Sequence, residues 1–479
     1  MPSFKEINFR YTDARSEKIY SPEVLQEAFV DLNQVMSEIF RPDKFIVYGP
    51  KGSGKTAIGA YLELWAQQQA TWFMRLEELD DFDFSVLSFH DEDRRSRVDL
   101  KGWRFVLLVR LIALMINDEA LQGANPELAR LAEDLRAHGI LPSTNLTVLA
   151  ERTLGRKQGI KFNLFAEIGA EGERSTTNEG KSPDKVADAL LLLIEQLRPT
   201  GGKYVLIIDG LDYVLRDGDD RVYTIGDLIQ AARSINETLV RVGIDGKILV
   251  LLRDEIARLI PSPDLSKRLN DHGIYLNWYH NYRDPFGNDL LKIIERRAHM
   301  VGFDGTIEQL WKAWFPKKIG NLPSAQYIIG RTRILPRDII SFFRCLQKLE
   351  EPPFTFNAVM SAEQRHSEWM FEEMSDALVG LVPSEVKQAI NGVLRDVGRV
   401  FTVGDLGESL KKRALSTLIT PEALAKTLFE THWIGNVWVT DNGHRAVVFH
   451  SRARNVAFSP ERRCVLHLGV AKGLKLDLD

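Results

Sequence analysis

The sequence predicts an α/β fold with a parallel five-stranded sheet, a long helical insertion, a helical lid and a C-terminal winged-helix domain. Three observations predict it. Buried-type runs of leucine and β-branched residues alternate with helical patterns through the first 300 residues, as in a parallel sheet covered by helices. A glycine-rich loop joins the first of these runs to a helix. Three helical patterns and then a hairpin pattern end the chain, which is the order of a winged helix.

Composition excludes several classes of protein. The 479 residues suggest two to four domains, and a net charge of −4 gives no global basic field for nucleic acid. Cys345 and Cys464 show no C-x-x-C spacing, so neither a disulfide framework nor a zinc site is expected. The most apolar run, 105–116, is too short for a membrane span and contains Arg110. With no signal-peptide core at the N-terminus, we expect a cytoplasmic protein without a membrane partner.

The glycine-rich loop carries the strongest chemical signal. Residues 49–56 read G-x-x-x-x-G-K-T between a strand at 45–48 and a helix from 57 to 67. Small residues let backbone N–H groups wrap a triphosphate at a helix N-terminus. Lys55 would reach the β- and γ-phosphates, and the Thr56 hydroxyl would bind Mg²⁺. The predicted nucleotide-binding residues are Gly49, Pro50, Lys51, Gly52, Ser53, Gly54, Lys55, Thr56 and Ala57.

An acidic residue follows a second buried strand, as a P-loop NTPase requires. The run 205–208 ends in Asp209, which is placed to bind Mg²⁺. Many P-loop ATPases have a water-activating Glu next, but here that residue is Gly210. Asp212 is therefore the next candidate for activating water, and capping the following turn is its alternative role. No N-K-x-D guanine reader follows the strands, so we expect ATP and Mg²⁺ as cofactors.

The remaining core elements fall in order along the chain. A leader region at 1–40, with a helical pattern at 22–40, precedes an ATPase core at 41–300, and the leader helix should pack beside the first strand. The insertion at 100–200 is either decoration or a surface for partner binding or self-assembly. The strand at 247–252 ends in Arg253, which either senses the γ-phosphate or pairs with an adjacent acid.

Residues 301–375 form the predicted helical lid. They contain the stretch GRTRILPRD at 330–338, just before a helix at 338–349. An arginine cluster at a helix start suits the binding of nucleotide phosphates. Arg333 and Arg337 are our first choices for that contact, with Arg331 as the third, and a surface cluster paired with acids is the alternative.

Residues 376–479 form the predicted winged helix. Basic residues near its second helix and its wing could contact nucleic-acid phosphates, and protein contacts are the alternative use of such a domain. These basic residues are Lys411, Lys412, Arg413, Arg445, Arg452 and Arg454.

Together these motifs resemble the STAND-type P-loop ATPases, which are relatives of AAA+ ATPases. The match lies at GPKGSGKT (49–56), VLIIDGLD (205–212) and GRTRILPRD. The chain looks most like stand-alone bacterial P-loop ATPases found in anti-phage defence gene clusters. The resemblance implies an ATP-driven switch that controls oligomerisation or a partner. The chain departs from typical STAND members because it lacks sensor repeats and an effector domain, which suggests that a separate protein carries the output.

Three hypotheses of function follow. The first is a slow ATPase acting as a switch or regulatory subunit, either as a homo-oligomer or with an effector protein. The second is a DNA-engaging AAA+-like initiator or loader that uses the winged helix. The third is a nucleotide-binding scaffold that hardly hydrolyses, which Gly210 allows. Salt-dependent DNA binding separates the second from the first, and Mg²⁺-dependent turnover separates the third.

Overall fold

The computed structural model describes most of the chain. The described residues are 3–79, 82, 99–137, 141, 147–148, 183–211, 221–260, 264–279, 284–439, 445–450 and 456–476. Asp212, the predicted hairpin turn at 441–444, and Arg452 and Arg454 lie outside these residues.

The chain forms two compact units, which we describe separately. The sheet unit comprises Asn33–Tyr48 and Ile58–Tyr275. The lid unit comprises Met1–Leu32, Gly49–Ala57 and Leu276–Asp479. The phosphate-binding loop therefore belongs with the lid by its contacts. No helix among the described residues is long and apolar enough to cross a membrane.

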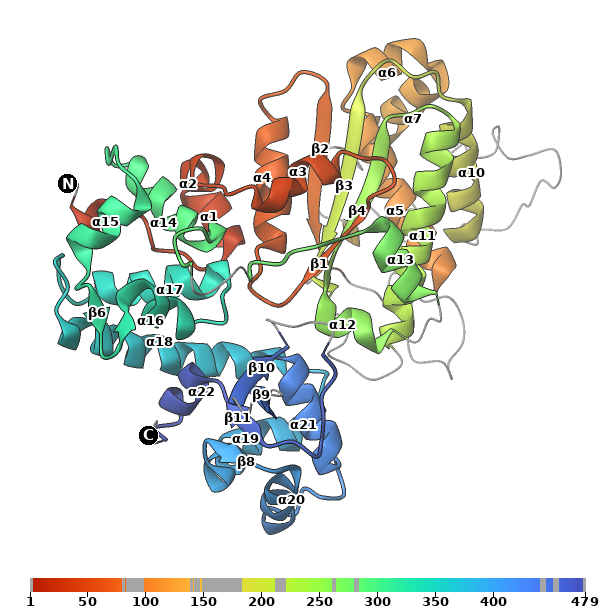
Figure 1. The fold of residues 1–479 in the computed structure, drawn as a ribbon. Helices are drawn as coiled ribbons and strands as arrows, with labels where there is room; N and C mark the ends of the chain where they lie inside the picture. The colour runs from red at the N-terminus through yellow and green to blue at the C-terminus, as the bar shows by residue number, and fades with distance from the viewer. Residues whose placement is uncertain are drawn as a thin grey trace. The chain divides into compact units, whose positions relative to one another are not determined.

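The predicted parallel five-stranded sheet is confirmed (Figure 1). Its order is β2-β3-β4-β1-β5. The β1–β5, β2–β3 and β3–β4 pairs are parallel. The strands are β1 (Ile46–Gly49), β2 (Trp72–Glu78), β3 (Lys203–Asp209), β4 (Gly246–Arg253) and β5 (Gly273–Tyr275). The pattern GIYLNWY predicts a strand over 273–279, but β5 ends at Tyr275.

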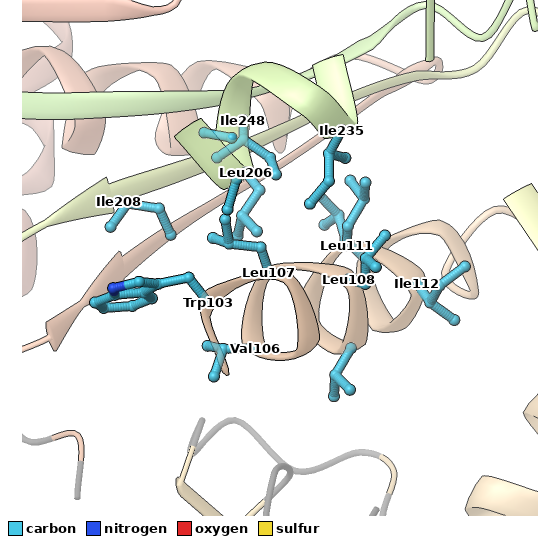
Figure 2. Close-up of a cluster of buried hydrophobic side chains, with 14 of the residues drawn as sticks. Trp103, Val106, Leu107, Leu108, Leu111, Ile112, Leu206, Ile208, Ile235 and Ile248 are labelled. Carbon is cyan, nitrogen blue, oxygen red and sulfur yellow. The ribbon is translucent and has the colours of Figure 1, made fainter. Parts of the chain in front are cut away.

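One face of the sheet is covered by helices that include the predicted insertion. These are α5 (Leu100–Met115), α10 (Pro183–Gln196) and α11 (Arg221–Arg241), with α6 (Glu119–Ala124) and α7 (Pro126–Ala137) following α5. Nearly every residue of α5 is buried. Its Trp103 and Leu107 point toward Ile208 and Leu206 of β3 (Figure 2). The indole of Trp103 also donates to the Thr224 carbonyl at 2.8 Å. The insertion thus begins with a core helix, because removing α5 would expose this face of the sheet.

The opposite face is covered by α4 (Lys55–Ala66), the helix that follows the loop. Gly59 allows α4 to lie close to the sheet. A Cβ at this position would stand 3.0 Å from Leu76, 3.2 Å from Leu251 and 3.3 Å from Ile207. Successive strand residues point to opposite faces, so the alternate residues of β2, β3 and β4 face α4.

The segment leading into β1 is held by a buried lysine. Lys247 of β4 donates to the carbonyls of Ile39 and Arg41 at 2.5 Å and of Lys44 at 3.1 Å. Ile39 is the last residue of the short helix α3 (Val35–Ile39), and Arg41 and Lys44 follow that helix. Burial lowers the pKa of Lys247 to about 8. The ammonium group satisfies carbonyls that the end of a helix leaves without partners.

The leader divides instead of forming one helix at 22–40. α1 (Ala14–Tyr20) and α2 (Pro22–Glu27) belong to the lid unit, and α3 belongs to the sheet unit. The helix breaks because Asn33 and Gln34 adopt φ values of 49° and 59°, which an α-helix cannot contain. Phe4 and Phe9 pack instead with Phe343 of the lid.

The lid unit contains five helices and a short hairpin between residues 284 and 377. The helices are α14 (Asp289–His299), α15 (Ile307–Trp314), α16 (Ser324–Gly330), α17 (Pro336–Gln347) and α18 (Phe356–Ala377), and the hairpin is β6 (Lys318–Ile319) with β7 (Leu322–Pro323). α17 begins at Pro336, two residues earlier than expected, so Arg337 lies in its first turn. The position of proline at N1 suits its fixed φ and missing N–H.

The C-terminal part has the predicted winged-helix order. Its elements are α19 (Ser384–Val397), β8 (Val400–Phe401), α20 (Val403–Lys412), α21 (Pro421–Glu430), β9 (Ile434–Val439), β10 (Arg445–Phe449), β11 (Cys464–Leu466) and α22 (Leu468–Gly473). The strands form one sheet in the order β10-β9-β11-β8. α22 packs on α18, where Lys472 pairs with the fully buried Glu363 at 2.8 Å.

Candidate nucleotide-binding site

The phosphate-binding loop has the strand–loop–helix context that its sequence predicted. It connects β1 to α4, and a turn closes where the Ser53 N–H donates to the Pro50 carbonyl at 3.1 Å. Gly52 and Gly54 adopt φ values of +92° and +95°. Only glycine occupies this region at little cost, so these two residues give the loop its shape.

Lys55 carries the charge of the loop. Its side chain is buried, and Nζ donates to the carbonyls of Gly49 at 2.9 Å and Pro50 at 3.0 Å. The ammonium group therefore stays at the start of α4, where the helix dipole also favours an anion. Thr56 is the next residue of α4 and is half-buried. Its hydroxyl oxygen is a hard ligand of the kind that Mg²⁺ prefers.

A tryptophan that the sequence analysis missed anchors the loop. The buried Trp278 donates its indole N–H to the Ser53 carbonyl at 2.8 Å. Its neighbour Leu276 lies so close to Gly49 that a Cβ there would approach within 3.2 Å. The only sequence signal was an aromatic residue within the strand predicted at 273–279, which is common in proteins and gives no hint of this contact.

Within the lid unit, the lid contacts the loop directly. The Arg337 N–H donates to the Gly52 carbonyl at 3.4 Å. Lys51 Nζ lies 3.5 Å from Oε2 of Glu373 on α18, and Arg337 Nη1 lies 2.9 Å from the same oxygen. Arg337 Nε also donates to the Thr12 carbonyl at 3.2 Å. Burial alone would raise the pKa of Glu373, but Arg337 and Lys51 outweigh it and hold that pKa below its usual value.

The other two predicted sensor arginines contact acids of the lid itself. Arg333 binds Asp338 through its backbone N–H and Nε at 2.9 Å and through Nη2 at 2.6 Å. Both side chains are buried, and although burial opposes ionisation, Arg333 lowers the pKa of Asp338 to about 2. Arg331 Nε lies 3.0 Å from Glu363. Of the three arginines, the structure brings Arg337 to the loop.

In the sheet unit, Asp209 and Arg253 stand at the carboxyl ends of neighbouring strands. Asp209 ends β3, is buried and accepts the Gly210 N–H at 2.8 Å. Gly210 has a φ of +80°, a conformation in which Glu would be strained. Arg253 ends β4 and is half-buried. Parallel strands present these ends at one edge of the sheet, where ligands of open α/β sheets bind.

Comparison with known proteins finds one family model that matches part of the chain. The family model described as the FunZ-associated C-terminal helical domain matches residues 288–375, which run from the start of α14 into α18. This part of the chain is too small to show membership of a family. No curated protein matches the sequence.

Several solved structures resemble the chain at low similarity. The Orc1 protein of Aeropyrum pernix in complex with DNA is 15% identical, with a TM-score of 0.38 over 95% of this chain and 92% of that one. Cdc6p from Pyrobaculum aerophilum is 12% identical, with a TM-score of 0.32 over 99% of each chain. The Thermotoga maritima RuvB Holliday junction branch migration motor is 13% identical, with a TM-score of 0.29 over 92% and 96%. Likeness at this level carries no argument about function.

We predict that Arg333→Ala destabilises the lid and does so most at neutral pH. It leaves the buried Asp338 carboxylate without its partner, which typically costs about 3–5 kcal/mol. Without Arg333, burial raises the pKa of Asp338, so acidification protonates the carboxyl and removes the penalty. Urea unfolding at pH 7 and pH 4 should show a deficit that shrinks at pH 4.

The exposed Arg365 on α18 supplies the control, because Arg365→Ala should unfold like the wild type. A wild-type unfolding midpoint for Arg333→Ala at pH 7 would contradict a structural role for the Arg333–Asp338 pair.

Proposed function

We propose that this protein binds ATP with Mg²⁺, hydrolyses it slowly and acts as a nucleotide-controlled switch. The observation that carries this proposal is the contact between the phosphate loop and the lid through Lys51, Glu373 and Arg337. A triphosphate bound by the loop would compete with Glu373 for the two cations. The same three charged side chains would therefore couple nucleotide binding to the position of the lid.

The residues of the proposed site have separate roles. Lys55 neutralises the β- and γ-phosphates, and backbone N–H groups around Gly52 and Gly54 bind their oxygens. Thr56 and Asp209 would supply the hydroxyl and carboxylate oxygens that hold Mg²⁺, and the charge of the metal would offset that of the phosphates. Arg253 and Arg337 are the candidates for contact with the γ-phosphate.

A change at the lid would reach the C-terminal part through α18. Glu363 on α18 binds Arg331 before α17 and Lys472 on α22. His467, at the start of α22, lies 3.2 Å from the Thr332 carbonyl. Because these contacts tie the lid helices to the winged helix, we propose that nucleotide state exposes or covers a surface for self-assembly or for an effector protein. The resemblance to stand-alone defence ATPases suggests that this output serves anti-phage defence.

The alternative function, a DNA-engaging initiator or loader, has weaker support in the charges of the winged helix. Lys412 and Arg413 both pair with Asp396, at 3.0 and 2.9 Å. α21 carries Glu422 and Glu430 against a single lysine. A helix entering a groove of DNA needs an excess of positive charge facing the phosphates.

The first prediction tests the nucleotide site itself. Lys55→Ala should abolish measurable ATP binding, because it removes the fixed charge at the β- and γ-phosphates. Calorimetric titration with MgATP measures this, and Lys312→Ala, on the exposed surface of α15, should keep wild-type affinity. ATP affinity equal to that of the wild type in Lys55→Ala would refute the phosphate-loop site.

The second prediction tests the switch through two substitutions with opposite signs. Arg337→Ala should reduce the preference for ATP over ADP about tenfold or more, because one charge-assisted hydrogen bond is worth about 1.5–3 kcal/mol. Glu373→Gln should instead raise ATP affinity, since the triphosphate no longer displaces a carboxylate. Calorimetry with both nucleotides decides. An unchanged ATP/ADP ratio in Arg337→Ala together with unchanged affinity in Glu373→Gln would leave the lid without a part in sensing.

The third prediction separates the switch from the DNA alternative. Fluorescence anisotropy with duplex DNA should show no specific binding at 150 mM salt, with or without ATP. A dissociation constant that weakens steeply between 50 and 200 mM salt, and that depends on Lys411 and Lys412, would favour the initiator or loader.

A further inference from the structure

The pairing of β2 with β3 brings a second acidic residue beside Asp209. The two strands are parallel, and Glu78, the last residue of β2, is the register partner of Asp209, the last residue of β3. Directly paired residues of neighbouring strands point to the same face of a sheet and have Cβ atoms about 5 Å apart. Glu78 is half-buried, as a residue at a strand end next to a ligand site should be.

The alternation of side chains fixes which face this is. Leu206 and Ile208 of β3 lie in the core with α5 (Figure 2), and Phe73 of β2 stacks on Tyr204 of β3 at 5.5 Å. Ile207, which lies between Leu206 and Ile208 in β3, points to the opposite face and lies against Gly59 of α4.

The face toward α4 ends in charge on three neighbouring strands. Leu76, Ile207 and Leu251 approach Gly59, and the residues two further along their strands are Glu78, Asp209 and Arg253. This is the face covered by the helix that starts at Lys55. Each of the three therefore lies on the α4 side of the sheet at its carboxyl edge, where ligands of open α/β sheets bind.

We propose that Glu78 is the catalytic base of the proposed ATPase, taking the part that Gly210 cannot play. The inference rests on the proposed ATP hydrolysis. Glu78 accepts a proton from water while the water oxygen bonds to the γ-phosphorus. The bond between that phosphorus and the oxygen bridging to the β-phosphorus breaks, and its electron pair leaves with ADP. Phosphate is released, and Glu78 returns the proton to solvent.

Neighbouring carboxylates are less suited to this part. Glu77 points to the other face, where it pairs with Arg110 of α5, and it is buried. Asp209 is the residue proposed to hold Mg²⁺, so its carboxylate would be committed to the metal. A base on the adjacent strand keeps the two tasks on separate residues and places a second carboxylate beside Asp209 for the water.

The test compares binding with turnover in Glu78→Gln. The amide keeps the size of the side chain but cannot accept the proton, so single-turnover hydrolysis should fall by about 100-fold or more. MgATP affinity measured by calorimetry should stay within about threefold of the wild type. Glu78→Asp, which shortens the reach of the carboxylate, should retain an intermediate rate. Glu127→Gln, a half-buried glutamate on α7 that pairs with Arg130, is the matched control and should hydrolyse normally.

Each further outcome has a distinct meaning. Wild-type hydrolysis by Glu78→Gln overturns the assignment of Glu78 as the base. If only Asp212→Asn loses hydrolysis, Asp212 is the base instead. Failure of the wild-type protein to bind MgATP overturns the proposed function instead. If Glu78→Gln loses its fold by circular dichroism, Glu78→Asp decides, because a rate equal to that of the wild type would then exclude Glu78 as the base.

Discussion

One carboxylate, Glu373, connects the phosphate loop to the lid. It contacts Lys51 of the loop and Arg337 of α17, and the three side chains are mostly shielded from solvent. Exposed pairs are worth about 0–1 kcal/mol, but partial burial strengthens these contacts and makes it costly to leave one charge without its partner. A triphosphate offers the same two cations a more concentrated negative charge. The contact between the loop and the lid is therefore stable without nucleotide, and a bound triphosphate would still compete with Glu373 for the two cations.

In the proposed switch, the lid would transmit this competition because its interior is held by charges as well as by aromatic packing. Glu363 is fully buried and binds Arg331, Lys472 and the Tyr327 hydroxyl, at 3.0, 2.8 and 2.6 Å. Burial, followed by the neighbouring Glu363, raises the pKa of Tyr327 to about 12, so the phenol remains a donor. A buried network with several partners tolerates little rearrangement. This network therefore joins the lid helices to α22 and favours their movement together in the proposed switch.

The sequence predicted the sheet and the loop because both depend on local patterns. These are apolar runs of strand length, glycines at fixed spacing, and the charged residues Asp209 and Arg253 at the ends of two strands. It could not separate Arg333 from Arg337, since that choice depends on which acid each arginine meets, and Glu373 lies 36 residues beyond Arg337. The break in the leader helix falls at Asn33 and Gln34, where no glycine or proline indicates it in the sequence. Glu78 became visible only through strand register, which one sequence does not specify.

Gly52 has two separate reasons to remain glycine. Its φ of +92° excludes other residues on backbone grounds, and a Cβ there would stand 3.3 Å from Cβ of Arg337. Any substitution at this position would therefore alter the shape of the loop and its contact with the lid together. Evolution, or an engineer, can adjust the strength of the lid contact without disturbing this glycine by changing Lys51 of the loop, or Arg337 of α17 and Glu373 of α18.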